Sequence, residues 1–444
     1  MKFIPLTEVR DKLNTISTSF CLAKWLQSTT VLSNGFTHSC HHPHQHKIDF
    51  NEVQKNHLAL HNTPQKIAAR HDLLNNIQTP ECDYCWRVEN IGNPNIYSDR
   101  INKSSEVWAM PYLNDVIDSS LGENIYPKYL EVSFENTCNF ACYYCLPEIS
   151  SRILGEVESK GPYVLATDPE YLSPSKLKNR GAYPIHRDDY NPYTEAFWKW
   201  WPDLKLNLLT FRITGGEPLL SKHTWKIFDD LIEIPHKELI FAVNSNFGVP
   251  DQIMNSFISK IPLIANSVKS FEIYTSAEAT GKQQEYIRYG MIWETFKKNV
   301  ENVCETIREL NNVTFVIMAT VNILSVTTFT DFLDFVICLK DKYSNGVRHK
   351  IVVSINFLRH PEFGCLTNLE PKLKTKYSTI WLNFLKDNEE KLNDIEINQF
   401  KRLIEFMNSA QPDELLNKNL KLFFTEYDKR KGLNFNETFT ELSY

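Results

Sequence analysis

Three cysteines in a short run are the feature that most constrains this chain. Cys138, Cys142 and Cys145 are spaced C-x₃-C-x₂-C, and they directly follow residues 129–135, which read as a β-strand. The run therefore places three thiols on one tight loop at the end of a strand. Three thiolates bind three irons of a four-iron cluster and leave the fourth iron open. The alternatives are a partial zinc site or inert buried thiols, but structural zinc takes four protein ligands and no fourth is adjacent.

A glycine-rich segment follows the next predicted strand. Residues 214–218 read Thr-Gly-Gly-Glu-Pro and end the strand predicted at 208–214. Glycines let the backbone approach a ligand closely, and amides at a strand end can bind polar groups of that ligand. The alternative is an ordinary turn between a strand and a helix.

The two motifs together resemble the radical S-adenosylmethionine (SAM) superfamily. The resemblance implies a [4Fe–4S] cluster on the three cysteines, with SAM chelated to the open iron. It also implies reductive cleavage of SAM to a 5′-deoxyadenosyl radical, which abstracts hydrogen from the substrate. Arg288 is implied to clamp the methionine carboxylate, because a guanidinium fork suits that anion. The SAM-binding residues implied are Tyr144, Gly215, Gly216, Glu217, Ser276 and Arg288.

Four further cysteines lie near the N-terminus. Cys82 and Cys85 form a C-x₂-C pair, and Cys21 and Cys40 flank an Asn34-Gly35 turn that predicts a hairpin. We expect Cys21 and Cys40 to lie on neighbouring strands. Four thiolates can saturate a metal centre, which is either an iron–sulfur cluster or a structural zinc ion.

The N-terminal motifs resemble the twitch module of the N-terminal-twitch radical SAM family. This resemblance rests on the four cysteines together with Trp25, Gly35, Ser98 and Arg100, and it implies a second, auxiliary [4Fe–4S] cluster. Lys24 departs from the pattern at a position where proline is usual, and His41 departs from it where a second cysteine is common. We predict that the neighbouring histidines form a solvated loop rather than a metal site; they are His38, His41, His42, His44 and His46.

The remaining chain predicts an α/β fold. The resemblance implies a partial (β/α)₆ barrel, with functional groups at the C-terminal ends of its strands. We predict strands at 129–135, 208–214, 238–244, 270–275, 313–321 and 350–357, and helices at 377–392 and 395–407. The predicted domains are an auxiliary-cluster domain at 1–115, the barrel at 125–365 and a helical C-terminal cap at 366–444. Residues 150–205 are an insertion within the barrel, whose aromatic run 197–201 indicates either a lid or ordinary packing.

Three cysteines remain outside these motifs. Cys304 and Cys338 occur within apolar helical patterns, and we expect both to be buried. Cys365 follows the last predicted strand and is a candidate for contact with the substrate.

Composition limits the partners of the protein. The chain has 444 residues, a net charge of −6 and a pI near 6.1, which gives no indication of nucleic-acid binding. No apolar run is long enough to cross a bilayer, and charged residues at 8–12 replace the apolar stretch of a signal peptide. We therefore expect a cytoplasmic protein without a membrane partner. Ten cysteines in a reducing compartment favour metal ligation over disulfides.

These inferences predict a radical SAM enzyme that acts on a peptide, a carbohydrate or a nucleotide. The auxiliary cluster favours an oxidative reaction, and an electron donor such as flavodoxin or ferredoxin is expected. One alternative is a radical rearrangement without net redox change. The other is a zinc-stabilised binding or scaffold protein without radical chemistry.

Overall fold

The computed structural model describes residues 4–40, 43–93, 96–119, 124–346 and 350–442. The chain divides into two compact units. Unit 1 contains residues 1–135, 181–215 and 236–242, and unit 2 contains residues 136–180, 216–235 and 243–444. The insertion at 150–205 is thus shared between the units, and the chain passes between them several times.

Unit 1 combines a mixed sheet with short helices. Its strands follow the order β6-β4-β1-β2-β3, in which β6, β4 and β1 are parallel and β2 and β3 are antiparallel. The strands are β1 Gln27–Val31, β2 Phe36–His38, β3 His46–Lys47, β4 Tyr129–Ser133 and β6 Thr210–Thr214. The helices are α1 Leu6–Ile16, α2 Ala23–Leu26, α3 Phe50–Lys55, α4 Pro64–Leu74, α5 Asp83–Asn90, α6 Asp99–Ser104, α7 Leu113–Asp118 and α10 Pro192–Asn207.

The predicted hairpin is present between β1 and β2. Gly35 has a φ of +68°, which favours glycine, and its position allows β2 to fold back on β1. The expectation that Cys21 and Cys40 lie on neighbouring strands is wrong, however. Cys21 precedes α2, and Cys40 follows the end of β2. The short helix α2 lies between Cys21 and β1, so the two cysteines lie beyond the ends of the paired strands.

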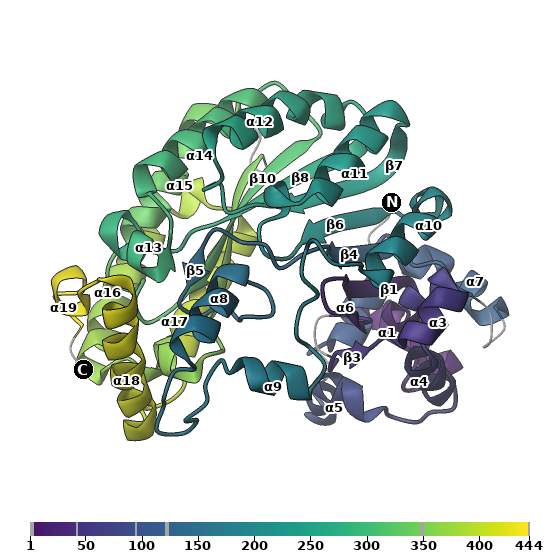
Figure 1. The fold of residues 1–444 in the computed structure, drawn as a ribbon, viewed down its shortest axis with the longest axis horizontal. Helices are drawn as coiled ribbons and strands as arrows, with labels where there is room; N and C mark the ends of the chain where they lie inside the picture. Colours follow the sequence, from purple (N-terminus) through teal and green to yellow (C-terminus); the bar gives the residue numbers. More distant parts are fainter. Residues whose placement is uncertain (1–3, 41–42, 94–95, 120–123, 347–349, 443–444) are drawn as a thin grey trace. The chain divides into compact units, whose positions relative to one another are not determined.

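Unit 2 contains parallel strands covered by helices. β8 Val268–Ser276, β10 Val313–Val321 and β11 Ile351–Phe357 are adjacent and parallel, and Figure 1 shows helices α12, α14 and α15 packed along these strands. The other strands are β5 Ala141–Cys142 and β9 Arg288–Tyr289. The helices are α8 Ser151–Lys160, α9 Pro174–Asn179, α11 Lys222–Glu233, α12 Asp251–Ala265, α13 Gly281–Ile287, α14 Trp293–Ile307, α15 Phe329–Tyr343, α16 Pro371–Asp387, α17 Asp394–Asn408, α18 Glu414–Lys431 and α19 Phe435–Thr438.

β7 His236–Asn244 begins in unit 1 and ends in unit 2. In unit 1, the amide of Ile240 donates to the carbonyl of Leu209 over 2.8 Å. In unit 2, the amide of Ser245 donates to the carbonyl of Tyr274 over 2.8 Å, just beyond the strand end. The end of β7 is therefore fixed beside β8.

The six predicted strands correspond to β4, β6, β7, β8, β10 and β11, and the two predicted C-terminal helices correspond to α16 and α17. The mixed α/β class with parallel strands is therefore confirmed. The aromatic run 197–201 lies within α10, where Phe197, Trp200 and Trp201 are buried. Phe197 packs against Phe134 and Phe211 within unit 1, so this run belongs to the core.

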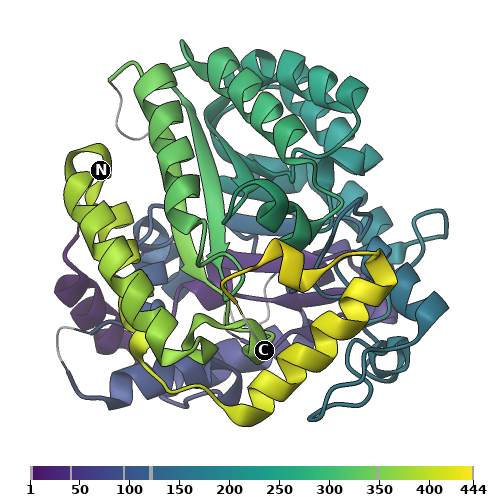
Figure 2. The ribbon, with the colours of Figure 1, turned by 90° about the vertical axis from the view of Figure 1, so that its left-hand side faces the viewer.

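No described helix combines the length and the apolar character required to span a bilayer. The longest described helix, α18, appears in yellow in Figure 2. It begins with an Asp413 cap, whose side chain accepts from the amide of Leu416, and it ends at Gly432, which has a φ of +66°.

Candidate metal and cofactor site

The cysteine loop (residues 136–145) is held in place by segments far from it in sequence. β5 lies inside the loop and pairs antiparallel with β9, with Cys142 opposite Arg288. The amide of Tyr143 donates to the carbonyl of Ile287, and the amide of Cys138 donates to Ser151 Oγ over 3.1 Å. A tight turn brings the amide of Cys145 within 3.0 Å of the carbonyl of Cys142. The loop therefore has a defined shape.

The three thiols of the cysteine loop influence one another. Burial, and secondly the neighbouring Cys142, raise the pKa of Cys138 to about 12. Burial also raises the pKa of Cys145, and Cys142 and Cys138 raise it further. Such mutual effects require the thiols to lie near one another. Because a bound metal replaces thiol protons, this donor set fits a metal centre with three protein ligands.

The thiols do not form a preassembled site for a single ion. Among the described residues, no three His, Cys, Asp or Glu side chains are gathered closely enough to hold a metal ion. A zinc ion requires every sulfur within about 2.3 Å of one point. A four-iron cluster places its thiolates on separate irons, so it accepts a wider spacing of the three thiols.

Gly216 packs directly against the start of the cysteine loop. A Cβ atom at Gly216 would lie 2.3 Å from the carbonyl oxygen of Thr137 and 2.7 Å from that of Asn136. The amide of Glu217 donates to the same Thr137 carbonyl over 2.7 Å. Glycine is therefore required here by the backbone of the loop, in addition to any approach of SAM. In unit 1, Gly215 has a φ of +120°, and a Cβ there would lie 2.4 Å from Ser133 Oγ.

Glu217 is buried and organises the residues around the loop. Its carboxylate accepts from the amides of Asn246 over 2.6 Å and Leu219 over 3.0 Å. Burial raises the pKa of Glu217 to about 7, although these hydrogen bonds oppose the shift. Asn246 Nδ2 donates in turn to Asn139 Oδ1 over 2.8 Å and lies 4.0 Å from Cys138 Sγ. Glu217 thus connects the glycine segment to the first cysteine, and its contact with SAM stays a prediction.

Arg288 pairs with Glu278, a residue that the sequence analysis missed. Arg288 Nη2 donates to Glu278 Oε2 over 2.7 Å, and Arg288 Nε lies 3.2 Å from both carboxylate oxygens. Tyr144 donates its hydroxyl to Glu278 Oε1 over 2.9 Å, and the Arg288 guanidinium lies 5.5 Å from the Tyr144 ring. The guanidinium edge assigned to SAM therefore already has a buried carboxylate partner. The only sequence signal for Glu278 was its place two residues after Ser276, at the end of β8.

The C-terminal helix α18 contacts the cysteine loop. Tyr427 donates its hydroxyl to the carbonyls of Ala141 and Tyr286, and Phe424 lies 5.2 Å from the ring of Tyr143. Tyr286 donates its hydroxyl to Asp428 over 2.6 Å. Through these contacts, α18 supports a loop that lies almost three hundred residues earlier in the sequence. The sequence analysis placed these residues only within a helical C-terminal cap and assigned them no contact.

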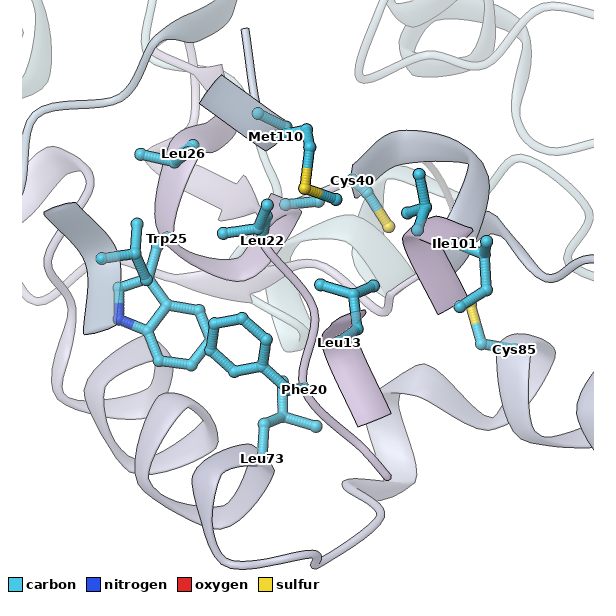
Figure 3. Close-up of a cluster of buried hydrophobic side chains, with 14 of the residues drawn as sticks. Leu13, Phe20, Leu22, Trp25, Leu26, Cys40, Leu73, Cys85, Ile101 and Met110 are labelled. Carbon is cyan, nitrogen blue, oxygen red and sulfur yellow. The ribbon is translucent and has the colours of Figure 1, made fainter. Parts of the chain in front are cut away.

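The four N-terminal cysteines meet in the core of unit 1. Cys21, Cys40, Cys82 and Cys85 line one small cavity. Figure 3 shows Cys40 and Cys85 among the buried apolar side chains of this core, and Cys21 and Cys82 pack against the same cluster. Burial, and secondly Cys82, raise the pKa of Cys21 to about 11. Burial also raises the pKa of Cys85, to which each of the other three thiols adds.

Two cations, Lys24 and Arg100, line this cavity in unit 1. Lys24 pairs with Glu81, and Arg100 pairs with Glu89 over 2.8 Å. Lys66 and Arg70 are buried elsewhere in unit 1, with neutral hydrogen-bond partners among the described residues, although Glu81 acts on Lys66 electrostatically. Lys66 Nζ donates to Ser28 Oγ and Thr37 Oγ1, whereas Arg70 contacts the Lys24 carbonyl, Asn62 Oδ1 and His61. Burial lowers the pKa of both groups, that of Arg70 to about 9.

The described histidines are not a solvated cluster, so that prediction is wrong for two of them. His38 is buried and contacts the carbonyl of Cys40, because β2 carries it into the sheet. His46 bonds Thr63 Oγ1 over 2.8 Å, and burial lowers its pKa to about 4. His44 is exposed. His41 and His42 lie outside the described residues.

The other candidate residues are placed as follows. Ser276 is half-buried at the end of β8, opposite Met318. Cys365 is buried with its thiol 3.8 Å from the Pro361 carbonyl, and burial raises its pKa to about 11. Cys304 is buried as predicted. The prediction for Cys338 is wrong, because helical periodicity places it on the exposed face of α15.

No family model matches the sequence. The chain is 26% identical over 155 residues to a GTP 3′,8-cyclase of Psychromonas ingrahamii, which covers 35% of this chain and 36% of the relative. It is 26% identical over 172 residues to a GTP 3′,8-cyclase of Acaryochloris marina, which covers 38% and 43%. The matches thus span less than half the length of these curated relatives. Among solved structures, Streptococcus suis SuiB bound to S-adenosylmethionine superposes with a TM-score of 0.37 and 13% identity, over 83% of this chain and 71% of SuiB.

The contact of Gly216 with Thr137 predicts that Gly216→Val disturbs the cysteine loop. The motif alone predicts weaker SAM binding with an intact cluster. The structure predicts loss of iron as well, because the added side chain displaces the backbone before Cys138 at a cost of about 1–3 kcal/mol. Iron per chain after anaerobic reconstitution measures the effect. Gly155→Ala in α8 is the control, since nothing lies within 4 Å of its added Cβ. Normal iron in Gly216→Val would contradict this role.

The buried pair of Arg288 and Glu278 predicts a large loss of stability in Glu278→Gln. The substitution leaves the guanidinium buried without a counter-charge, which costs about 3–5 kcal/mol of unfolding free energy. Denaturant unfolding of the metal-free protein measures it. Glu294→Gln, which alters the exposed pair with Lys297, should have little effect. If Glu278→Gln unfolds like the wild type, the pair is not structural and the guanidinium is available to SAM.

Proposed function

We propose that this chain, a member of the radical SAM superfamily, is an enzyme that cleaves SAM reductively and removes a hydrogen atom from its substrate. The observation that carries the proposal is the set of three neighbouring thiols on the loop after β4. Three thiolates leave one iron of a four-iron cluster without a protein ligand. The cofactors of the superfamily are a [4Fe–4S] cluster and SAM, which together supply an electron and a 5′-deoxyadenosyl radical when bound.

The protein holds and shields this site. Cys138, Cys142 and Cys145 are the proposed ligands of the cluster, and the contact between Gly216 and Thr137 fixes the loop that carries them. Tyr144 and Ser276 are proposed to contact SAM, from the loop and the end of β8. Arg288 of β9 is proposed to contact it through the guanidinium edge that Glu278 does not occupy. Packing of α18 on Tyr143 limits the access of water to the loop. Exclusion of water protects a reactive radical from side reactions.

We assign the six strands β4, β6, β7, β8, β10 and β11 to a partial (β/α)₆ barrel. The N-terminal residues, with the four-cysteine core, are assigned to a twitch-like module, and the helices after residue 366 to a cap. The order of the strands along the chain supports the barrel, since each predicted strand exists and is followed by a helix or a functional loop.

An auxiliary [4Fe–4S] cluster on Cys21, Cys40, Cys82 and Cys85 completes the proposal. The charges at the cavity support an anionic centre. Lys24 and Arg100 line the cavity with the four cysteines, and both act electrostatically to favour the thiolate of Cys21, against the effect of burial. A centre ligated by four thiolates carries net negative charge, which these two cations favour. Four protein ligands leave no open iron, so this cluster serves structure or electron transfer, and the latter fits an oxidative reaction.

A redox-neutral rearrangement is the second candidate. The curated relatives are named as cyclases that act on GTP, and a cyclisation need not change the redox state of the substrate. The two candidates differ in whether the auxiliary cluster accepts an electron. In both, we propose a cytoplasmic enzyme that receives electrons from a flavodoxin or a ferredoxin.

The proposal predicts that the Cys138→Ala/Cys142→Ala/Cys145→Ala variant loses about half of its iron and all cleavage of SAM. Formation of 5′-deoxyadenosine from SAM with dithionite, under anaerobic conditions, is the measurement. Cys338→Ala is the matched control, because Cys338 is exposed and distant from both cysteine groups in sequence. Undiminished 5′-deoxyadenosine from the triple variant would refute the radical SAM activity.

The auxiliary centre predicts that Lys24→Met lowers stability more in the loaded protein than in a variant with serine at positions 21, 40, 82 and 85. In both backgrounds the substitution leaves Glu81 without its cation. Only in the loaded protein does it also remove a cation beside an anionic centre, at an added cost of about 1–3 kcal/mol. Anaerobic denaturant unfolding measures both.

The control for this experiment is Lys55→Met, at an exposed lysine of α3, which should change little in either background. An equal effect of Lys24→Met in both backgrounds would contradict an anionic centre. Elemental analysis of the same protein distinguishes the metals, and zinc in place of iron would exclude electron transfer at this site.

A further inference from the structure

A cavity of about 530 Å³ begins where the cysteine loop ends. One wall is formed by residues 146–148, which directly follow Cys145. The opposite wall is formed by residues 165–180, part of the insertion for which the sequence suggested a lid. Residues 360–363 after β11 and the first turns of α18 complete it. Its volume lies within the range of about 300–1,000 Å³ that is usual for ligand pockets.

This cavity is distinct from the proposed cofactor site. The residues assigned to SAM are absent from its lining, which contains none of Tyr144, Gly216, Glu217, Ser276 and Arg288. The cavity nevertheless borders the cysteine loop, because its lining residues Leu146 and Pro147 directly follow Cys145. A molecule bound here therefore lies close to the proposed cluster without replacing SAM.

The floor of the cavity is apolar and aromatic. Leu165, Tyr171, Leu177 and Phe363 are buried lining residues. The rings of Tyr171 and Phe363 lie 6.1 and 5.0 Å from that of Phe423 on α18, which supports both. Tyr171 is only 8% exposed and lines the cavity. Its hydroxyl can form a hydrogen bond with a polar atom of a bound ligand.

The wall opposite the cysteine loop is fixed rather than loose. Asn419 of α18 accepts from the amide of Ala166 over 2.8 Å and donates to Thr167 Oγ1 over 2.7 Å. Arg430 donates to the carbonyls of Gly161 and Pro162 and lies 4.0 Å from the ring of Tyr163. The same helix therefore supports the cysteine loop and the cavity wall, and the cavity keeps its shape without a ligand.

The rim carries charges of both signs, and both of its cations are already paired. Lys176 pairs with Asp168 over 2.5 Å, and Arg180 pairs with Glu148 over 2.6 Å. Glu362 is a third carboxylate on the lining. A nucleoside polyphosphate requires a surplus of cations, but here three carboxylates face two paired cations. A ligand with both an amide or amino group and a carbonyl group suits such a rim.

We propose that this cavity binds the substrate, and that the substrate is an amino-acid residue with a large apolar side chain, either free or within a peptide. The role of the bound molecule as substrate rests on the proposed radical chemistry, and its chemical class rests on the cavity itself. The side chain lies on the floor of Leu165, Leu177 and Phe363, with a polar atom at the Tyr171 hydroxyl. The backbone groups of the substrate lie at the charged rim.

Two arginine substitutions on neighbouring residues of α18 test the proposal. Leu416 lines the cavity, whereas Leu415 is 47% exposed and does not. Leu416→Arg places a charged side chain in the mouth of the cavity, and Leu415→Arg places the same side chain in solvent. NMR titrations of the full-length holoenzyme use three probes: N-acetyl-phenylalaninamide as a peptide mimic, free phenylalanine, and GTP.

We expect at least one of the two phenylalanine probes to bind the wild type and Leu415→Arg, and its apparent Kd to rise about tenfold in Leu416→Arg. A stronger signal from the capped probe indicates a peptide source, and a stronger signal from the free amino acid indicates a small molecule. Tyr171→Phe retains the packing of the floor and should raise the Kd by about fivefold. Binding of neither phenylalanine probe, or binding of GTP that Leu416→Arg abolishes, overturns the proposal.

Formation of 5′-deoxyadenosine without substrate separates this inference from the proposed function. All three variants should form it at the wild-type rate, because none of these residues is assigned to SAM or to the cluster. Loss of this activity in Leu416→Arg alone would assign the cavity to the cofactor and overturn the inference. Its absence from the wild type would refute the radical activity, while the titrations would still decide the class of ligand.

Discussion

The cysteine loop depends on the close approach of Gly216 to the carbonyl of Thr137. The loop has little regular structure, so neighbouring segments determine its shape. The glycine segment fixes its start, β9 fixes its middle through Cys142, and Ser151 of α8 binds the amide of Cys138. A side chain at Gly216 would meet main-chain atoms, which cannot move aside as a flexible side chain can. The position of the thiols is therefore fixed before any metal binds.

The two cysteine groups differ in the charges that lie around them. Around the cysteine loop, Arg288 is balanced by Glu278 and the nearby Glu217 carboxylate is bound by backbone amides. In unit 1, Lys24 and Arg100 line the cavity that the four cysteines share. Burial raises the pKa of Cys21 and Cys85 in unit 1 and of Cys138 and Cys145 on the loop, so these thiols keep their protons until a metal displaces them. The two cations at the cavity support the proposed anionic centre in unit 1.

Helix α18 connects the two functional regions of unit 2. Tyr427 and Phe424 contact the cysteine loop, and Asn419 and Phe423 support the cavity wall and floor. A substrate in the cavity and a cluster on the loop would thus share one rigid support. This arrangement suits radical chemistry, in which the reacting atoms must be positioned closely. The charged C-terminal segment of α18 contacts the same region, since it binds Glu156 and lies over the ring of Tyr163.

The sequence by itself determined the main strands and the candidate ligands of the cluster. Strand patterns predicted β4, β6, β7, β8, β10 and β11, because alternation and apolar runs are local signals. The spacing of Cys138, Cys142 and Cys145 predicted one loop with three thiols for the same reason. Only the tertiary structure decided the partners of these residues. It paired Arg288 with Glu278, exposed Cys338, buried His38, and placed Lys24 and Arg100 beside the four cysteines. Each of these depends on contacts between residues distant in sequence, and no local pattern encodes which buried charge faces which partner.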